Sequence, residues 1–414
     1  MDRLVSGFGI FVMMGLAFAA CPRERRRLVR WRTVGFGVGL VLLFALIVLK
    51  TPAREAFLWA DAAVNRCLEF TKAGSDFVFG SLASPTAPAG FVFAFQILPT
   101  IVFFAALMSV LYHVRIMPFL VRQMGRGLSR VLGTSGAESF STVADIFVGQ
   151  TEAPLVIRPY ISALTLSELN ACMTAGFATT AGGVLAAYVG MLKPFVPEIG
   201  GHLIACSVMC APASIVIAKL MLPEDSMPAT SGSTQIAIPR TTSNLLDAIT
   251  TGTIDGLRLA VNVGAMLLAI IALTAMANFG LAELGRTVSL DLSIERILGW
   301  VFAPIAWCMG VPSEDVLKVG SLLGQKTVLT EFIAYTNMSK ELAKDPMWLT
   351  ERGRLIAGYA LCGFANFGSI GIQIGGYSGL APERRADFSR LALRAMVGGA
   401  LTTCLVACVA GLLL

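Results

Sequence analysis

The stretch Gly149-Gln150-Thr151-Glu152-Ala153-Pro154 interrupts an otherwise apolar segment, Ser141–Leu164. Proline has no backbone N–H and disrupts a helix interior, and each flank is too short to cross a bilayer. The segment therefore predicts a re-entrant hairpin whose tip lies at membrane depth and lines a cavity. A carboxylate at that depth is unfavourable unless a partner or ligand compensates it, so Glu152 is a candidate functional residue.

A second polar interruption of the same kind lies in the other half of the chain. Val311–Tyr335 is largely apolar but contains Lys326-Thr327-Val328-Leu329-Thr330-Glu331-Phe332, so a Thr-Glu pair again lies in apolar surroundings. This segment predicts a second hairpin, and Glu331 is a candidate functional residue for the same reason as Glu152. For either pair taken alone, a misplaced loop is the alternative interpretation.

Each hairpin is followed by an apolar span with a polar break at its middle. The first break is Gly176-Phe177-Ala178-Thr179-Thr180-Ala181-Gly182-Gly183, and the second is Gly363-Phe364-Ala365-Asn366-Phe367-Gly368-Ser369-Ile370. Glycine-rich centres often only allow close helix packing, but here hairpin and broken span occur twice, after spans of opposite orientation. An inverted repeat with paired broken helices indicates a transporter whose binding site lies near the bilayer midplane.

The composition predicts an all-α polytopic membrane protein around these elements. Hydrophobic residues make up 56% of the 414 residues, charged residues 14%, and the mean hydropathy is +0.75. Soluble proteins have about 25% charged residues. Apolar runs of spanning length predict eight transmembrane helices. The runs are Leu4–Ala20, Val34–Leu49, Phe91–Tyr112, Ala171–Met191, Leu203–Leu222, Leu257–Leu281, Leu355–Tyr377 and Ala395–Leu414.

Arginine clusters at the ends of the spans predict the orientation. Cys21–Arg32 holds six Arg and one Glu and is expected in the cytoplasm, which puts the N-terminus outside. Counting spans forward also puts Arg115–Arg130 and Leu380–Arg394 in the cytoplasm. Lys340–Arg354, which carries both positive and negative charges, is placed outside and is the exception to the rule that positive segments are cytoplasmic. Since positive charge follows Leu4–Ala20 rather than preceding it, this run is expected to be a retained span and not a signal peptide. The net charge of +6 is therefore attributed to topology and not to nucleic-acid binding.

The remaining stretches predict peripheral elements. Arg54–Asp76 and Met117–Leu132 are amphipathic and are expected to lie in the membrane interface, although a soluble connector is an equal alternative for the first. The Ser-, Thr- and Pro-rich segment 223–256 predicts a cytoplasmic linker between two halves. The nine Cys show no paired CxxC spacing, and neither an HExxH motif nor a nucleophile–base set is present, so an enzyme is not expected. A channel is the alternative class, and accumulation of solute against a gradient would exclude it.

Three motifs resemble the concentrative nucleoside transporter family. They are Gly149–Leu155, Thr330–Tyr335 and Cys362–Ile370, and the resemblance covers nearly the whole chain. It implies a homotrimer in a bacterial inner membrane that imports nucleosides by an elevator mechanism, in which a transport domain moves against a trimer-holding scaffold. The implied partners are the nucleoside, the lipid bilayer and further copies of the chain.

The resemblance also implies a division of the chain. Residues 1–116 would be mainly scaffold, with three spans and an interfacial helix. Residues 117–222 would form the first transport repeat, and 223–256 the linker. Residues 257–310 would supply a scaffold span and another interfacial helix, and 311–414 the second transport repeat.

Substrate-binding positions follow from the same resemblance. The first hairpin and its partner helix would bind the base through Gln150, Thr151, Glu152 and Val184. The second hairpin and the seventh span would bind the ribose through Glu331, Asn366 and Ser369, with Phe364 nearby. The residue types fit, because Gln and carboxylate groups complement a nucleobase edge and carboxylates accept strongly from ribose hydroxyls. A nucleobase or another small polar solute is the alternative substrate.

The resemblance implies a Na⁺ site between the first hairpin and the broken fourth span, at Asp145, Val148, Thr179 and Thr180. Asp145 departs from the Asn expected of the family. A carboxylate supplies oxygen ligands and a full charge for Na⁺, but in a low-dielectric setting it can also carry a proton. Na⁺ is expected as the coupling ion, with H⁺ as the alternative, and no organic cofactor is expected.

Overall fold

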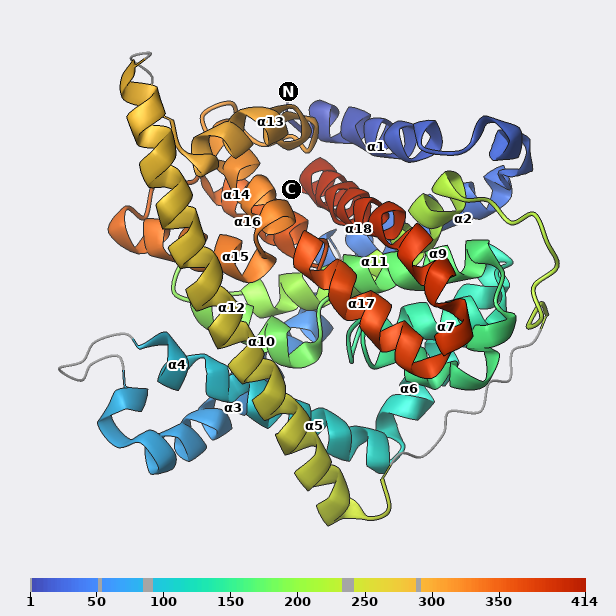
Figure 1. Ribbon diagram of the computed structural model, residues 1–414, viewed down its shortest axis with the longest axis horizontal. Helices are drawn as coiled ribbons and strands as arrows, with labels where there is room; N and C mark the ends of the chain where they lie inside the picture. The colour runs from blue at the N-terminus through green and yellow to red at the C-terminus, as the bar shows by residue number, and fades with distance from the viewer. Residues whose placement is uncertain (1, 51–53, 85–91, 233–241, 288–291) are drawn as a thin grey trace.

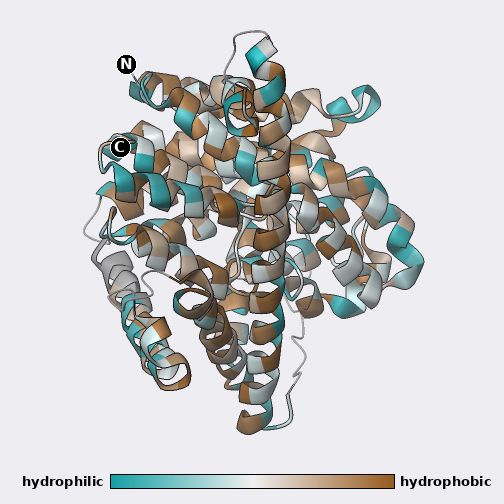
Figure 2. Cartoon of the chain, turned by 60° about the vertical axis from the view of Figure 1, so that its left-hand side comes forward, coloured by the Kyte–Doolittle hydropathy of each residue, from teal (hydrophilic) through white to brown (hydrophobic). Residues whose placement is uncertain are grey.

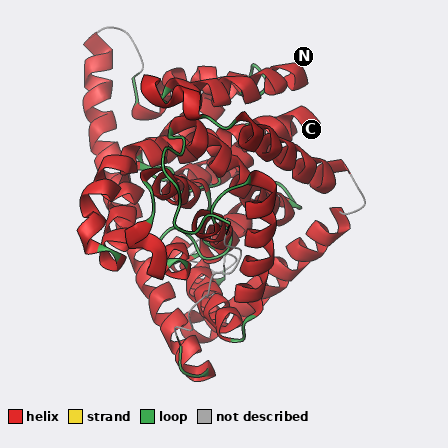
Figure 3. Ribbon diagram, turned by 90° about the vertical axis from the view of Figure 1, so that its right-hand side faces the viewer, coloured by secondary structure: helices red, strands yellow, loops and turns green. Residues whose placement is uncertain are grey.

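The computed structural model describes residues 2–50, 54–84, 92–232, 242–287 and 292–414. Every regular element in these ranges is a helix (Figures 1 and 3). Seven helices in the described residues are long and apolar enough to cross a membrane. The remaining expected span, Leu355–Tyr377, is divided into two shorter helices. The prediction of an all-α polytopic fold is thus confirmed.

The first half of the chain holds eleven α-helices and three short 3-10 helices in its described residues. They are α1 (Asp2–Ala19), η1 (Arg23–Leu28), α2 (Trp31–Lys50), α3 (Arg54–Phe79), η2 (Gly80–Ala83), α4 (Phe93–Gln96), α5 (Leu98–His113), α6 (Ile116–Leu132), α7 (Gly136–Asp145), α8 (Ala153–Val156), η3 (Arg158–Ala163), α9 (Leu166–Ala178), α10 (Gly182–Leu192) and α11 (Ile199–Met221).

The second half holds seven α-helices and one 3-10 helix in its described residues. They are α12 (Leu245–Thr287), α13 (Ile294–Cys308), α14 (Val316–Val328), α15 (Glu331–Lys344), α16 (Glu351–Leu361), α17 (Phe367–Leu380), η4 (Pro382–Arg384) and α18 (Arg385–Leu413). The hairpin predictions correspond to α7 with α8 and to α14 with α15. Each segment folds as two consecutive helices joined by a turn, and the re-entrant hairpin at membrane depth stays a prediction.

Both predicted helix breaks are present. The fourth span is interrupted at Thr179–Ala181, between α9 and α10, and the seventh at Cys362–Asn366, between α16 and α17. Prediction from Gly-Phe-Ala followed by polar residues therefore located both breaks to within a few residues. The interfacial segments are helical as well, in α3 and α6, and their position relative to a membrane stays a prediction.

The spans divide into an inner and an outer group. In the segments Leu166–Leu192, Ile199–Met221 and Pro382–Leu413, 78–83% of the most apolar window is buried inside the chain. The corresponding share is 33% or less for α1, α2, α5 and α12. The inner group therefore packs against protein, whereas the outer helices present apolar surface outward, as the brown face of α12 in Figure 2 shows.

The structure corrects the expected extent of the linker. Residues 245–256, assigned to a linker over 223–256, are the first turns of α12, which runs diagonally from the upper left to the bottom in Figure 1. These turns pack on α5. A Cβ on Gly252 would lie 2.6 Å from Ser109 Cβ, and one on Gly256 would lie 2.8 Å from Val102 Cα. Two glycines four residues apart let the backbones approach closely, and this packing extends the helix beyond its apolar stretch.

We predict that Gly256→Ala lowers the free energy of unfolding by about 1–3 kcal/mol, because the added methyl group meets the α5 backbone and forces the helices apart. Gly280→Ala is the matched control on the same helix. No atom lies within 4 Å of a Cβ at Gly280, so this change should leave stability equal or raise it by up to about 1 kcal/mol. Thermal unfolding of the detergent-purified variants measures both. Equal stability of the two variants would contradict the packing argument.

Candidate functional site

The two broken spans cross each other at their breaks. Gly363 has a φ of +132°, and a Cβ there would lie 2.7 Å from the carbonyl oxygen of Ala178. Beside it, Thr180 Oγ1 lies 3.7 Å from Cys362 Sγ. Only glycine permits both this conformation and this approach. Backbone groups left without helical partners by both breaks are therefore concentrated at one place inside the protein.

Glu331 is held at this junction by groups from three helices. It is the first residue of α15, whose N-cap Thr330 accepts a hydrogen bond from the Ile333 amide at 3.3 Å. Tyr188 of α10 donates to Glu331 Oε1 at 3.0 Å, and Asn366 donates to Oε2 at 2.8 Å. The carboxylate is buried, and a helix N-terminus favours its negative charge. Each oxygen accepts only one of these bonds, so acceptor capacity remains for a ligand.

Asn366 ties the second hairpin to the second broken span. It is the N-cap of α17, where its Oδ1 accepts from the Ser369 amide at 2.8 Å while its amide donates to Glu331. Ser369 is buried in the same turn. The structure therefore brings together the three residues expected to bind ribose. Phe364 lies within the break and is partly buried against the main apolar core.

Three aromatic side chains pack together next to Glu331. The Tyr188 ring stacks on Tyr335 at 4.2 Å between centroids and meets the edge of Phe332 at 5.5 Å. Tyr188 was not identified from the sequence, because a tyrosine is not an unusual residue in a membrane helix. Val184, the expected position one turn earlier, is buried within the apolar core instead. Tyr188 is thus the α10 residue that contacts Glu331.

Gln150 of the first hairpin lies between α9 and α17. A Cβ on Gly176 would be 2.9 Å from Gln150 Cβ and 2.6 Å from Gln373 Nε2, so these side chains crowd around a glycine. Gln373 donates to the Met173 carbonyl at 2.9 Å, but Gln150 Oε1 and Gln373 Oε1 are buried without a hydrogen-bond partner. Unsatisfied buried amide oxygens are unfavourable and fit a site that a polar ligand completes. Gln373 was not identified from the sequence.

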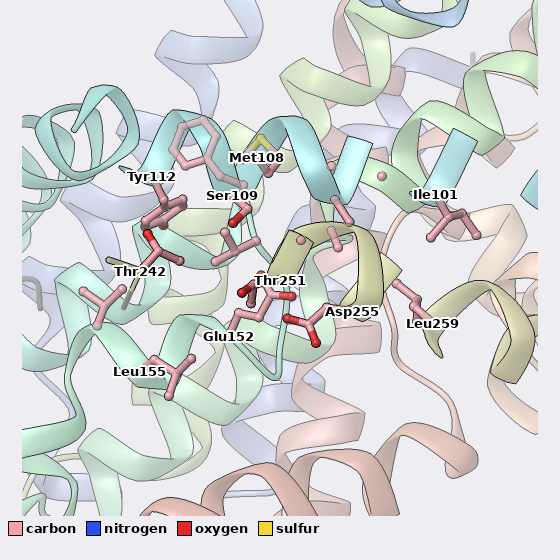
Figure 4. Close-up of a pocket in the computed structure, with 18 residues that line it drawn as sticks. Ile101, Met108, Ser109, Tyr112, Glu152, Leu155, Thr242, Thr251, Asp255 and Leu259 are labelled. Atoms are coloured by element: carbon pink, nitrogen blue, oxygen red, sulfur yellow. The ribbon is translucent and has the colours of Figure 1, made fainter. Parts of the chain in front are cut away.

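Glu152 faces a different space. It lines a cavity of about 280 Å³ between the first hairpin, the start of α10, and helices α5 and α12 (Figure 4). Asp255 of α12 lines the same cavity, so two carboxylates border one space. Thr151, next to Glu152, lies against Gly376 of α17. The structure therefore does not bring Glu152 into the cluster around Glu331.

The expected cation-binding residues surround the end of α7. Asp145 is its last residue and is 1% exposed, and neither carboxylate oxygen has a hydrogen-bond partner. Nearby, the Phe147 carbonyl accepts from the Gly182 amide at 3.1 Å, which places the turn containing Val148 against the first helix break. Thr179 donates to the Ala175 carbonyl at 2.9 Å, which leaves its oxygen lone pairs available.

This arrangement suits a monovalent cation or a proton. An unpartnered carboxylate inside a membrane protein needs a compensating positive charge. Among the described residues, no group of three or more His, Cys, Asp or Glu is placed to hold a metal ion, and backbone carbonyls, hydroxyls and one carboxylate are ligands that a hard cation accepts. The Thr180 hydroxyl is directed to Cys362 in this structure.

Three family models match the chain. "Na+ dependent nucleoside transporter N-terminus" matches residues 8–82, "Nucleoside recognition" matches 94–195, and "Na+ dependent nucleoside transporter C-terminus" matches 202–411. The third model alone covers half of the chain and includes the second hairpin, Glu331 and both halves of the seventh span. The second covers the first hairpin and the fourth span.

Related proteins match over the same length. An uncharacterized transporter of Haemophilus influenzae is 41% identical over 100% of this chain and 98% of its own length. Sodium/nucleoside cotransporter 1 of Rattus norvegicus is 40% identical over 100% of this chain, which spans 64% of that longer protein.

Solved structures agree in fold. CNTnw in an inward-facing substrate-bound state is 40% identical, with a TM-score of 0.91 over 100% of this chain and 98% of that chain. A variant of CNTnw in an outward-facing state is also 40% identical, with a TM-score of 0.92 and the same coverage. The existence of both states in a close structural relative supports alternating access. All of these matches are to transporters and none is to an enzyme. The chain therefore belongs to the family of Na⁺-dependent, concentrative nucleoside transporters.

Proposed function

We propose that this protein is a symporter that imports nucleosides of the uridine, cytidine and adenosine class, driven by Na⁺. The observation that carries the proposal is the buried Glu331 carboxylate, which Tyr188 and Asn366 hold with acceptor capacity to spare. A carboxylate fixed in this way accepts from sugar hydroxyls, and it is left unsatisfied by a solute that lacks them. This favours a nucleoside over a free nucleobase, the alternative substrate.

The base would be bound on the side of the first hairpin. Gln150 offers an unpartnered amide oxygen there, and the neighbouring Thr151 and Glu152 belong to the same turn. Val184 would contribute apolar surface only after a rearrangement, because it is buried in the core here. We infer that Glu152 reaches the base in another state of the transport cycle than the one described, since it now lines the cavity beside α12.

An elevator movement is the form of alternating access that we propose. The cavity beside Glu152 separates the first hairpin and α10 from α5 and α12, and the outer helices are much less buried than the inner ones. These features support a transport domain built from residues 117–222 and 311–414, moving against a scaffold built from 1–116 and 257–310. We further propose a homotrimer in a bacterial inner membrane with the N-terminus outside.

Asp145 supports cation coupling. Its buried, unpartnered carboxylate lies beside the turn that contacts the first helix break, so a cation there would link the hairpin to the substrate site. We propose Na⁺ because the rat relative is named a sodium/nucleoside cotransporter and because oxygen ligands dominate the site. H⁺ is the alternative, since Asp145 is able to carry a proton itself.

We predict that proteoliposomes accumulate radiolabelled uridine when a Na⁺ gradient is imposed and not when a matched pH gradient is imposed. Accumulation above the outside concentration separates a symporter from a channel. Free uracil should compete poorly. Accumulation driven only by the pH gradient would transfer the coupling role to H⁺, and failure under both gradients would refute the proposed function.

We predict that Glu331→Gln raises the uridine KM by about 10- to 100-fold, because the loss of charge-assisted hydrogen bonds to ribose removes about 1.5–3 kcal/mol. Glu341→Gln, which changes an exposed carboxylate on the same helix α15, is the matched control and should leave uptake unchanged. Initial-rate uptake at saturating Na⁺ measures both variants. An unaltered KM for Glu331→Gln would remove this residue from the substrate site.

We predict different effects for two replacements of Asp145. Asp145→Asn keeps one oxygen ligand and should preserve Na⁺-driven uptake with a Na⁺ half-saturation raised several-fold, whereas Asp145→Leu should abolish coupling. Asp345→Asn, at the end of α15, serves as the control. The readout is uridine uptake against Na⁺ concentration. If uptake is driven by protons, Asp145→Asn should abolish the drive entirely. Wild-type Na⁺ dependence in Asp145→Leu would contradict the assignment.

A further inference from the structure

Lys326 is a buried cation that the transport site as described does not use. It lies on α14, in the first arm of the second hairpin, and is 2% exposed. Its ammonium group donates to the Ala360 carbonyl at 2.8 Å and to Thr403 Oγ1 at 2.9 Å. Within the described residues it forms no ion pair with a carboxylate. An ammonium group buried without a counter-ion in contact is strongly unfavourable, so its presence calls for a role.

The position of this ammonium group is one that a bound cation favours. Ala360 is the second-last residue of α16, so its carbonyl is among those left without a partner where the broken helix ends. The C-terminal end of a helix carries partial negative charge, and such half-helix ends coordinate the coupling cations of transporters built from broken helices. The Lys326 ammonium group thus lies at a helix end where a bound metal cation would otherwise be favoured.

The first arms of the two hairpins, α7 and α14, end in buried charges of opposite sign. In the first, Asp145 lies seven residues before Glu152 and has no hydrogen-bond partner. In the second, Lys326 lies five residues before Glu331 and has two partners. The first hairpin therefore presents an anion that a mobile cation must neutralise. The second hairpin already contains a cation, the side chain of Lys326.

Lys326 also acts on the substrate site. Lys326 near the end of α14 and Glu331 at the start of α15 flank one turn, so their opposite charges attract across it. The bond of Lys326 to Ala360 fixes the end of α16 immediately before the Cys362–Asn366 break. Asn366 at the end of that break donates to Glu331. The ammonium group therefore balances the Glu331 charge through space and positions a hydrogen-bond donor to it.

We propose that Lys326 is a fixed cation that takes the place of a second coupling ion, and that it positions and electrostatically balances Glu331 for binding the ribose. This inference rests on the proposed function. It makes Lys326 a positioning residue with a selective effect, because loss of its charge weakens recognition of the sugar and not of the base. It also sets the stoichiometry at one coupling cation for each nucleoside.

The test uses the full chain in proteoliposomes with Lys326→Gln, which keeps a hydrogen-bond donor without the charge, and Lys326→Met, which keeps only the shape. Lys344→Gln, on the exposed end of the same hairpin, is the matched control. We expect both Lys326 variants to raise the uridine KM by about ten-fold or more. The KM for 2′,3′-dideoxyuridine should change by less than about three-fold, because it lacks the 2′ and 3′ hydroxyls that we expect Glu331 to accept from.

A double-mutant cycle adds a second readout. In a Glu331→Gln background, Lys326→Gln should produce little further change in the uridine KM, since the charge that it balances is gone. Equal weakening of uridine and dideoxyuridine, or full additivity with Glu331→Gln, would show a structural role only and overturn the proposal. Wild-type selectivity in Lys326→Gln would overturn it as well.

The wild-type protein supplies a measurement that does not depend on any variant folding. The reversal potential of uridine-coupled current gives the number of positive charges moved per nucleoside, for which we expect one. A value of two would show a second mobile cation and overturn the inference even if the Lys326 variants do not fold. Absence of any uridine accumulation by the wild type would instead refute the proposed function, so the two failures are distinguishable.

Discussion

The structure depends on where backbone hydrogen bonds are left open inside apolar surroundings. A helix interrupted in the hydrocarbon region frees N–H and C=O groups that lipid does not satisfy, so an interruption persists only where protein or a bound solute satisfies them. Here the two interruptions meet at Gly363 and Ala178. Their meeting concentrates polar backbone at one place, and the hairpins close around it. Glu331, Asn366, Gln150 and the turn after Asp145 all belong to that one polar junction or its edges.

Features marked by unusual residues in apolar sequence were predictable. Pro154, the paired Gly-Phe-Ala motifs and the two Thr-Glu pairs indicated the hairpins and both breaks, because each conflicts locally with a continuous helix. The cluster of Glu331, Asn366 and Ser369 also formed as the family resemblance implied. The residues expected to bind the base were less predictable, since Val184 lies in the core and Glu152 faces α12.

The features that sequence did not reveal depend on partners distant along the chain. Tyr188 reaches Glu331 across 143 residues, and Gln373 reaches Met173 across 200. Neither residue type is unusual in a membrane helix, so only the folded chain distinguishes it. The start of α12 at Leu245 was missed for a related reason. In the sequence Gly252 and Gly256 look like linker glycines, and only the structure shows that they pack against α5.

The cavity between the first hairpin and α12 has a pharmacological consequence. Its walls come from both the hairpin side and the α5–α12 side, so relative movement of the two must alter its shape. A small molecule that fills the cavity would contact both sides and prevent them from moving relative to each other. Such an inhibitor would arrest turnover from outside the sugar pocket around Glu331.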